Sequence, residues 1–258
     1  MIHLTINADD FGFDENRTKA ILESFRIGAI TRTTAMVNMP YFETAVGQIR
    51  KTGFFNRMGL HLNLTEGPAL TEAMRQCRFF CDEHGCFTAV FHRSIKSRIW
   101  LPKDVQEIAK REIEAQLKKF VDCGVTCLHL DSHHHVHTDL SVARLVIPLA
   151  ARYGFRTVRL SRNWGAGLSW TKRAYKFFLN RFVLGRLGGA SDFFTDFRGF
   201  KDGFAKLRDG CSVEVMVHPM YGDRKTGLSL VAPLTDSGRK IVVEQEFYTS
   251  IRDSVVFQ

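Results

Sequence analysis

IHLTINADDFG, residues 2–12, is an apolar, strand-like run that ends in two carboxylates and a glycine. Gly12 lets the backbone turn sharply, so one carboxylate of the Asp9-Asp10 pair can bind a metal while the other accepts a proton from water. The plainer interpretation is an acidic pair that caps the next helix. The stretch predicts a strand, a turn that carries functional side chains, and then a helix.

Two helices are clear in the sequence. Residues 14–28 combine a capping Asp14, an apolar stripe and an exit at Gly28. Residues 103–123 have the same organisation and are followed by Gly124. Each helix stands between two strand-like runs, which is the order of a β/α unit.

Strand-like apolar runs recur along the chain, separated by segments long enough for a helix. We predict seven strands, at approximately residues 2–8, 33–38, 57–63, 125–131, 157–161, 191–195 and 212–218. The 258 residues have room for one α/β barrel. No repeat or Pro/Gly/Ser linker divides them. We therefore predict a single domain over 1–258, an α/β barrel with about seven parallel strands.

The segment 66–101 is too long for a plain connection and too mixed for a clear helix. It is predicted to be an insertion, or a lid, over one end of the barrel. Within it, the run 77–86 holds three cysteines and a histidine that could bind zinc. Their spacing is not that of a common zinc module, so ordinary insertion residues are the favoured interpretation.

The composition is that of a soluble globular protein, with 45% hydrophobic and 24% charged residues. We expect a cytoplasmic protein, because no signal sequence or run of roughly 18 apolar residues is present. The six cysteines form no familiar secreted framework, and we assign them no disulfides.

The net charge of +9 could suit nucleic acid, a membrane surface or an anionic substrate. No RNA-binding signature or helix-turn-helix accompanies it, and we expect no nucleic-acid partner. Much of the charge lies in 162–186. Within it, 169–186 predicts a helix with aromatic residues along one face and basic residues around them. The simpler interpretation is an amphipathic barrel helix with a solvated basic side, and the alternative is contact with a membrane surface.

Polar side chains that can bind a metal follow several of the predicted strands. In parallel barrels the loops after the strands converge on one face, so these side chains can meet. The densest group is HLDSHHHVH, residues 129–137, with five histidines and an aspartate. His61 and Asn63 alternate onto one face of another strand, and His218 ends the last one before Pro219. The sequence therefore predicts a metal site.

Four motifs in this order, NADDFG, GLHLNLT, HLDSHHHVH and EVMVHP, resemble the YdjC family of carbohydrate deacetylases, which includes the ChbG and HpnK groups. The resemblance runs from about residue 3 to 219, and the segments 30–38 and 159–162 also look similar. It implies a distorted barrel akin to NodB-type deacetylases. It also implies a divalent metal ion and hydrolysis of N-acetyl groups on sugars.

Residue roles follow from motif position in the resemblance. Asp9 would be the general base, His218 the acid, and Asp10, His61 and His133 the metal ligands. Either His135 or His137 could contact substrate or take the acid role. Two imidazoles and a carboxylate suit zinc, and the resemblance also points to magnesium. Both ions stay open.

Several alternatives remain open from sequence. Arg159 or Arg162 could pair with Asp9 and hold it ionised, or could be an ordinary surface charge. The alternative activity is hydrolysis of another bond, such as a phosphoester or a cyclic amide, because a metal and a carboxylate alone do not choose the substrate. The expected partner is an N-acetylated sugar or glycolipid. A homo-oligomer is neither indicated nor excluded.

Overall fold

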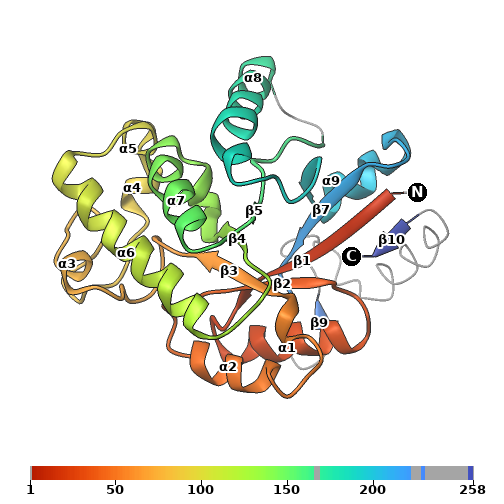
Figure 1. The fold of residues 1–258 in the computed structure, drawn as a ribbon, viewed down its shortest axis with the longest axis horizontal. Helices are drawn as coiled ribbons and strands as arrows, with labels where there is room; N and C mark the ends of the chain where they lie inside the picture. Colours follow the sequence, from red (N-terminus) through yellow and green to blue (C-terminus); the bar gives the residue numbers. More distant parts are fainter. Residues whose placement is uncertain (1, 166–168, 222–227, 230–254, 258) are drawn as a thin grey trace.

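All seven predicted strands are present and parallel in the computed structural model, which describes residues 2–165, 169–221, 228–229 and 255–257. The strands are β1 (Ile2–Phe11), β2 (Arg32–Ala35), β3 (Met58–Leu62), β4 (His129–Ser132), β5 (Thr157–Val158), β6 (Phe193–Asp196) and β7 (Ser212–Val217). Their order in the sheet is β5-β4-β3-β2-β1-β7-β6. The sheet curls into a half-barrel, which confirms the predicted distorted α/β barrel (Figure 1).

The first strand lies in the middle of this sheet. Its residues pair in parallel with β2 on one side and with β7 on the other. A short strand β10 (Val255–Phe257) also pairs with its beginning, and β8 (Met220–Tyr221) pairs with β9 (Leu228–Ser229) in a separate antiparallel ribbon. The strands β5 and β6 stand at the two ends of this order. Val158 of β5 forms a parallel bridge to Gly189, just before β6, and this bridge brings the two ends of the sheet together.

Helices cover the outside of the curled sheet, with α1 and α2 below it in Figure 1 and α5, α7 and α8 along the top. The α-helices are α1 (Glu15–Arg26), α2 (Phe42–Ile49), α3 (Glu72–Arg75), α4 (Val90–Arg93), α5 (Ile95–Ile99), α6 (Lys103–Asp122), α7 (Leu140–Arg152), α8 (Trp170–Phe178) and α9 (Phe197–Gly203). Short 3-10 turns are η1 (Phe55–Arg57), η2 (His133–Thr138), η4 (Leu184–Arg186) and η5 (Phe204–Lys206), and η3 (Leu179–Val183) is π-helical. None of the helices in the described ranges is long and apolar enough to cross a membrane.

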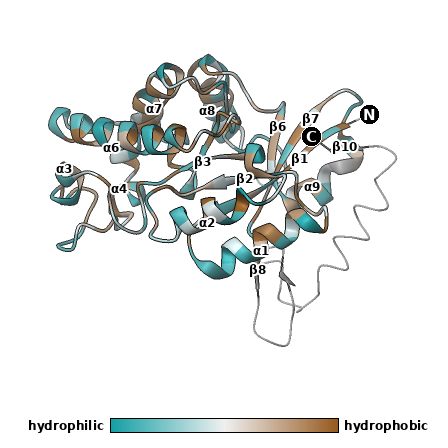
Figure 2. Cartoon of the chain, turned by 60° about the horizontal axis from the view of Figure 1, so that its bottom comes forward, coloured by the Kyte–Doolittle hydropathy of each residue, from teal (hydrophilic) through white to brown (hydrophobic). Residues whose placement is uncertain are grey.

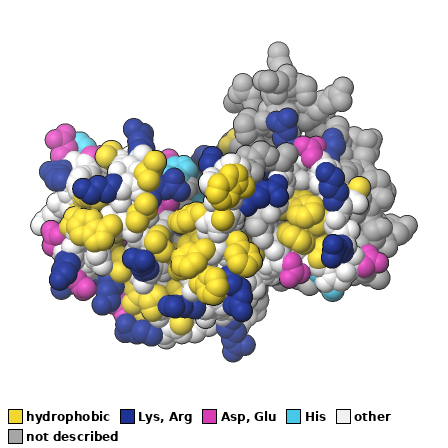
Figure 3. All heavy atoms as spheres, turned by 90° about the horizontal axis from the view of Figure 1, so that it is seen from above, with side chains coloured by type: hydrophobic (Ala, Val, Ile, Leu, Met, Phe, Trp, Pro, Cys, Tyr) yellow, Lys and Arg dark blue, Asp and Glu magenta, His cyan; other side chains and the backbone are white. Residues whose placement is uncertain are grey.

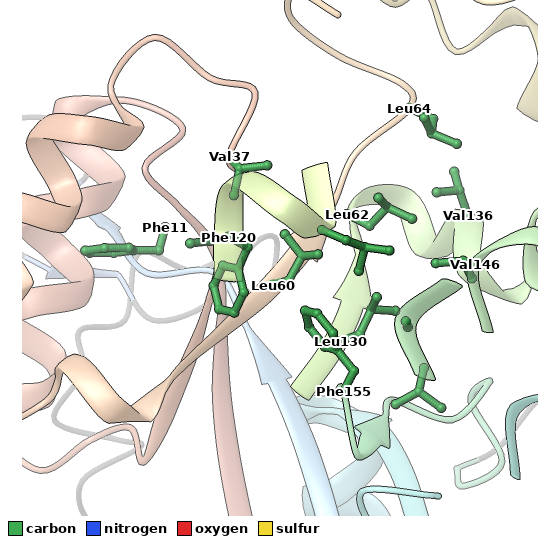
Figure 4. Close-up of a cluster of buried hydrophobic side chains, with 14 of the residues drawn as sticks. Phe11, Val37, Leu60, Leu62, Leu64, Phe120, Leu130, Val136, Val146 and Phe155 are labelled. Atoms are coloured by element: carbon green, nitrogen blue, oxygen red, sulfur yellow. The ribbon is translucent and has the colours of Figure 1, made fainter. Parts of the chain in front are cut away.

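The helices α1 and α6 form where the sequence predicted them. The Asp14 side chain accepts a hydrogen bond from the backbone N–H of Arg17 and so caps α1. Most helices carry hydrophilic residues on one side and hydrophobic residues on the other (Figure 2). Figure 4 shows one result, in which Phe120 of α6 packs near Leu60, Leu62 and Leu130 of β3 and β4. This packing fixes the carboxyl ends of both strands.

The segment 66–101, which the sequence predicts to be an insertion, is anchored to α6 by a buried glutamate. Glu112 accepts hydrogen bonds from the backbone N–H groups of Leu70 and Thr71 and from the Thr71 hydroxyl, at 2.8–3.0 Å. One turn later, Gln116 exchanges two hydrogen bonds with the backbone of Asn63, at 3.0 and 2.7 Å. These contacts hold the chain that leaves β3 in a fixed position.

The segment 169–186 differs from the simpler prediction. It is not one continuous helix, because α8 ends at Phe178 and the π-helical η3 and 3-10 turn η4 follow. It is also not an amphipathic helix with an apolar side on the barrel, because none of the nine residues of α8 is buried. Residues 222–227 and 230–254 of the predicted domain lie outside the described residues.

Candidate metal centre

The carboxyl ends of β1, β3 and β4 bring Asp10, His61 and His133 together. The ligand atoms of the three side chains lie within 4.8 Å of one another, and all three side chains are buried. The Asp10 Oδ1 atom is 2.9 Å from His133 Nδ1 and 3.3 Å from His61 Nε2. Burial would raise the pKa of Asp10, but contacts with the two imidazoles hold that pKa well below its usual range. Asp10 is thus a carboxylate at neutral pH.

The backbone at the end of β1 separates the two neighbouring carboxylates. Asp10 has a φ of 68°, in the left-handed region that few non-glycine residues adopt. Gly12 follows with a φ of 81°, and a Cβ there would lie 3.2 Å from the Cα of Phe42. This tight turn directs Asp10 to the histidines and leaves Asp9 facing the interior of the curled sheet. The two neighbouring carboxylates therefore contact different groups, Asp10 the two histidines and Asp9 the Arg159 guanidinium.

His61 is oriented by groups behind it. Its Nδ1 atom is 2.7 Å from Asp131 Oδ1 and 3.2 Å from the Thr34 hydroxyl, so the Asp131 carboxylate accepts the Nδ1–H and Nε2 faces Asp10. Burial alone would lower the pKa of His61, but the neighbouring carboxylates, led by Asp131, raise it to about 10. A carboxylate behind an imidazole is the usual arrangement that orients a metal-binding histidine.

Glu66 is a functional candidate that the motif analysis did not single out. Its Oε2 atom lies 3.0 Å from His133 Nε2, and contact with His133 lowers the pKa of Glu66. Burial would lower the pKa of His133, but hydrogen bonds to Asp10 and Glu66 raise it. Glu66 directly follows the GLHLNLT motif, residues 59–65, and that position was the available signal.

Arg159 lies in the interior of the curled sheet and joins four of its strands. It directly follows β5 and contacts Asp9 of β1 through two hydrogen bonds of 2.7 Å. Its other contacts are Asp131 of β4 at 2.7 Å and Glu214 of β7 at 2.6 Å. All four side chains are buried. Glu214 also pairs with Arg32 at 2.9 Å, and the charged residue inside an apolar strand was its signal in the sequence.

Asp9 is consequently held in the ionised form. Burial would raise its pKa, but the charge and hydrogen bonds of Arg159 hold that pKa well below the usual range. Arg162, the alternative partner considered from sequence, pairs with Asp196 at 2.9 Å instead. His218 is partly exposed, and its Nε2 atom lies 3.9 Å from Asp9 Oδ2.

His137 and His135, two further histidines of the 129–137 run, differ in burial and in hydrogen bonding. His137 is fully buried, donates from Nε2 to the Arg159 carbonyl at 3.0 Å, and accepts at Nδ1 from the Ser132 hydroxyl at 2.6 Å. Burial and the Arg159 charge lower its pKa to about 3, so it is a neutral supporting group. His135 is half-buried, with a buried Nδ1 that lacks a hydrogen-bond partner and a ring edge-on to Phe194.

Asn63 does not face the centre. Its side-chain oxygen accepts from the backbone N–H groups of Thr65 and Glu66, at 3.0 and 3.2 Å, and its amide contacts Asn38. Strand β3 ends at Leu62, so the predicted alternation of His61 and Asn63 does not continue. Asn63 shapes the turn that delivers Glu66.

The centre fits a divalent cation. Four acidic or imidazole side chains converge there, and the raised pKa values of His61 and His133 mean that the carboxylates attract positive charge. Two imidazoles and a carboxylate are donors that transition metals accept. Within residues 77–86, by contrast, His84 is exposed. None of the donor clusters in the described part of the chain contains a cysteine, so the alternative zinc site does not form there.

The fold and this centre together define a class of protein, a curled parallel α/β barrel with a carboxylate and histidine centre at the ends of its strands. The chain belongs to the YdjC family, whose model, described as YdjC-like protein, matches residues 3–252.

Two similar proteins align with nearly the whole chain. A carbohydrate deacetylase of Geobacillus stearothermophilus is 31% identical and covers 94% of this chain and 97% of that protein. One from Brevibacillus brevis is also 31% identical, over 98% and 96%. The solved structure of a candidate cellobiose-phosphate cleavage protein from Enterococcus faecalis matches with a TM-score of 0.71. It is 23% identical over 99% of this chain and 96% of that chain, and this similarity establishes the fold alone.

Proposed function

We propose that the protein removes N-acetyl groups from amino sugars, using a divalent cation held by Asp10, His61 and His133. The observation that carries the proposal is the convergence of these three side chains beside an ionised Asp9. Relatives named carbohydrate deacetylases, similar over nearly the whole chain, support the choice of an acetylated sugar over a phosphoester or a cyclic amide.

The chemistry divides between the cation and the chain. A bound divalent cation polarises the amide carbonyl and makes water a better nucleophile. Asp9 accepts the proton of the attacking water, and Arg159 holds its carboxylate in place through two hydrogen bonds. His218, 3.9 Å from Asp9, donates a proton to the departing nitrogen. His135 is half-buried near the same edge and is the alternative donor.

The donor set favours zinc over magnesium, because magnesium prefers oxygen ligands and retains several waters. Glu66 adds a carboxylate oxygen close to His133, and an oxygen ligand of this kind is what magnesium prefers. An N-acetyl sugar that is free and one that is attached to a lipid present the same acetamide, and both belong to the proposed substrate class.

The test is acetate release from N-acetylated sugars by metal-stripped protein reloaded with zinc or with magnesium. We expect release to require the ion and to disappear in Asp10→Ala and His133→Ala. His84→Ala is the matched control, because the His84 side chain is 79% exposed and belongs to none of the donor clusters of the described residues. Phosphate release from sugar phosphates in place of acetate release, or full activity of Asp10→Ala, would reject the proposal.

A further inference from the structure

Two segments carry most of the exposed large hydrophobic side chains of the described residues. Ten such side chains are exposed, and nine of them lie within residues 90–100 and 170–182. The nine are Val90, Ile95, Ile99, Trp100, Trp170, Tyr175, Phe177, Phe178 and Phe182. Scattered exposed apolar residues are normal on a soluble protein, but a gathered set marks a surface that contacts something else.

The two segments form one face of the molecule. Both α5 and the turn after α8 pack against α7. The Ser141 hydroxyl of α7 donates to the Ser97 carbonyl at 2.7 Å, and Arg98 of α5 pairs with Asp139 at the start of α7. Burial and the charge of the same Asp139 raise the pKa of Tyr175 of α8. Figure 3 shows the face from above, with hydrophobic side chains gathered among Lys and Arg side chains. We call residues 90–103 and 169–186 the aromatic-basic face.

The aromatic-basic face also accounts for the net charge of the chain. Residues 84–103 hold four Lys or Arg and no Asp or Glu, and residues 163–191 hold five and none. The chain has 27 other basic residues, and their number equals that of its 27 acidic residues. The nine basic residues of the two segments therefore account for the whole net charge of +9. Such concentration of one sign beside apolar side chains indicates an anionic, partly apolar partner.

None of the side chains of helix α8 is buried in the protein. Trp170 is 79% exposed and Phe177 is 67% exposed, whereas Leu179, Leu184 and Leu187, just beyond the helix, are buried in the core. The Ser169 side chain caps the helix start. The buried leucines anchor the segment, and the aromatic side chains of α8 project into solvent.

Beneath α8 lies a groove of about 450 Å³ whose lining includes four cationic side chains, Arg162, Arg173, Lys176 and Arg181. Burial, followed by the charges of Arg162, Lys172 and Arg98, lowers the pKa of Lys176. Asp192 is the acidic residue of the lining, and it is occupied by hydrogen bonds from Ser212. A phosphate group in this groove would relieve the repulsion among the cations.

We propose that the aromatic-basic face binds the surface of membranes that contain anionic phospholipid. Trp and Phe side chains insert at the boundary between headgroups and acyl chains, and Lys and Arg meet the phosphates while their stems cover apolar surface. Anionic lipid adds about 1 kcal/mol of attraction for each basic residue near the surface.

The face borders the candidate metal centre. Arg98 and His92 both pair with Asp139, two residues beyond His137. Lys176 Nζ donates to the Arg162 carbonyl at 2.9 Å, three residues beyond Arg159. Docking of the face on a membrane therefore places the centre beside the lipid headgroups. Given the proposed deacetylation, on which this step rests, the substrate is an N-acetyl sugar attached to a lipid.

The test is flotation of the full chain with phosphatidylcholine vesicles and with vesicles of phosphatidylcholine and phosphatidylglycerol. We expect flotation with the anionic vesicles alone, weakened by salt. The variants F177S/F178S and K172E/R181E should each bind at least about tenfold more weakly. They should keep the wild-type melting temperature, because these side chains are exposed. The matched controls are Ile27→Ser and Lys118→Glu, which change an exposed apolar residue and an exposed lysine elsewhere.

Several outcomes would overturn the docking proposal. One is a wild-type chain that does not float with anionic vesicles. Another is a pair of face variants that float as the controls do. A third is a wild-type dimer that does not float and that becomes a monomer in F177S/F178S. Acetate release from a soluble N-acetyl sugar is measured in parallel. Unchanged release by F177S/F178S separates failure of docking from failure of the proposed catalysis.

Discussion

Arg159 contacts three buried carboxylates, and this makes its side chain difficult to replace. Lysine would keep the charge, but an ammonium group cannot make the paired hydrogen bonds to Asp9 while also reaching Asp131 and Glu214. We expect Arg159→Lys to lower the free energy of unfolding by roughly 3 kcal/mol, because a buried carboxylate loses its partner. Urea unfolding measures the change. Arg156→Lys, at an exposed arginine three residues earlier, should change it by less than about 0.5 kcal/mol.

His137 gives a prediction about pH. Its folded pKa of about 3 lies below the unfolded value near 6.5, so between these values the unfolded chain binds a proton that the folded chain does not. The free energy of unfolding contributed by His137 is complete above pH 6.5 and falls as the pH drops towards 3. In His137→Gln this dependence is absent. The difference in stability between wild type and variant should therefore narrow by roughly 2 kcal/mol from pH 7 to pH 4.5.

Urea unfolding of both proteins at the two pH values makes this comparison. All other titrating groups are shared by wild type and variant, so their contributions cancel to first order. A stability difference that stays constant with pH would contradict the inferred state of His137.

At the scale of elements, Glu112 determines how the insertion sits on α6. In Glu112→Gln the amide nitrogen would face a backbone N–H of Leu70 or Thr71, and one donor would lose its acceptor. We expect a loss of about 1–3 kcal/mol in the free energy of unfolding, and faster protease cleavage within residues 66–101. Glu107→Gln, at an exposed position of the same helix, is the control. Equal cleavage rates would mean that Glu112 does not hold the insertion.

The elements differ in how well their sequence predicts them. The seven parallel strands are apolar runs whose burial follows from the residues themselves, and all seven were predicted. The short helices α3, α4 and α5 were not predicted, because four or five residues have too little periodicity to signal a helix. The break at Leu179 was missed because it depends on a distant contact, in which the Asn180 side chain bonds to the backbone of Ser161.

The same limit applies to the centre. That Asp10, His61 and His133 lie at one edge could be predicted because strand ends in a parallel sheet converge, whereas their choice as the metal ligands came from the resemblance to the YdjC family. Glu66 could not, because its place beside His133 depends on the turn that Asn63 shapes. The choice of Arg159 over Arg162 as the partner of Asp9 depends on which side chain turns into the interior, and both follow the same strand.

For the whole molecule, a cation that binds the folded state stabilises it by mass action. At a concentration about 100 times its Kd, zinc should add roughly 2.7 kcal/mol, which raises the melting temperature by about 5–10 °C. A chelator should reverse the rise. Asp10→Ala should melt at the same temperature with and without zinc, whereas His84→Ala should respond as the wild type does. An equal rise in Asp10→Ala would place the ion elsewhere.

The position of β1 in the middle of the sheet has a consequence for biosynthesis. Its neighbour β7 begins at Ser212, about 200 residues after β1, which a ribosome needs roughly 10–40 s to add. Glu214, one of the three carboxylates on Arg159, arrives with the same strand. Until then the nascent chain exposes an unpaired apolar strand edge, which can pair with other chains. This edge of β1 is therefore paired only late in translation, and it stays open to other chains until β7 has emerged.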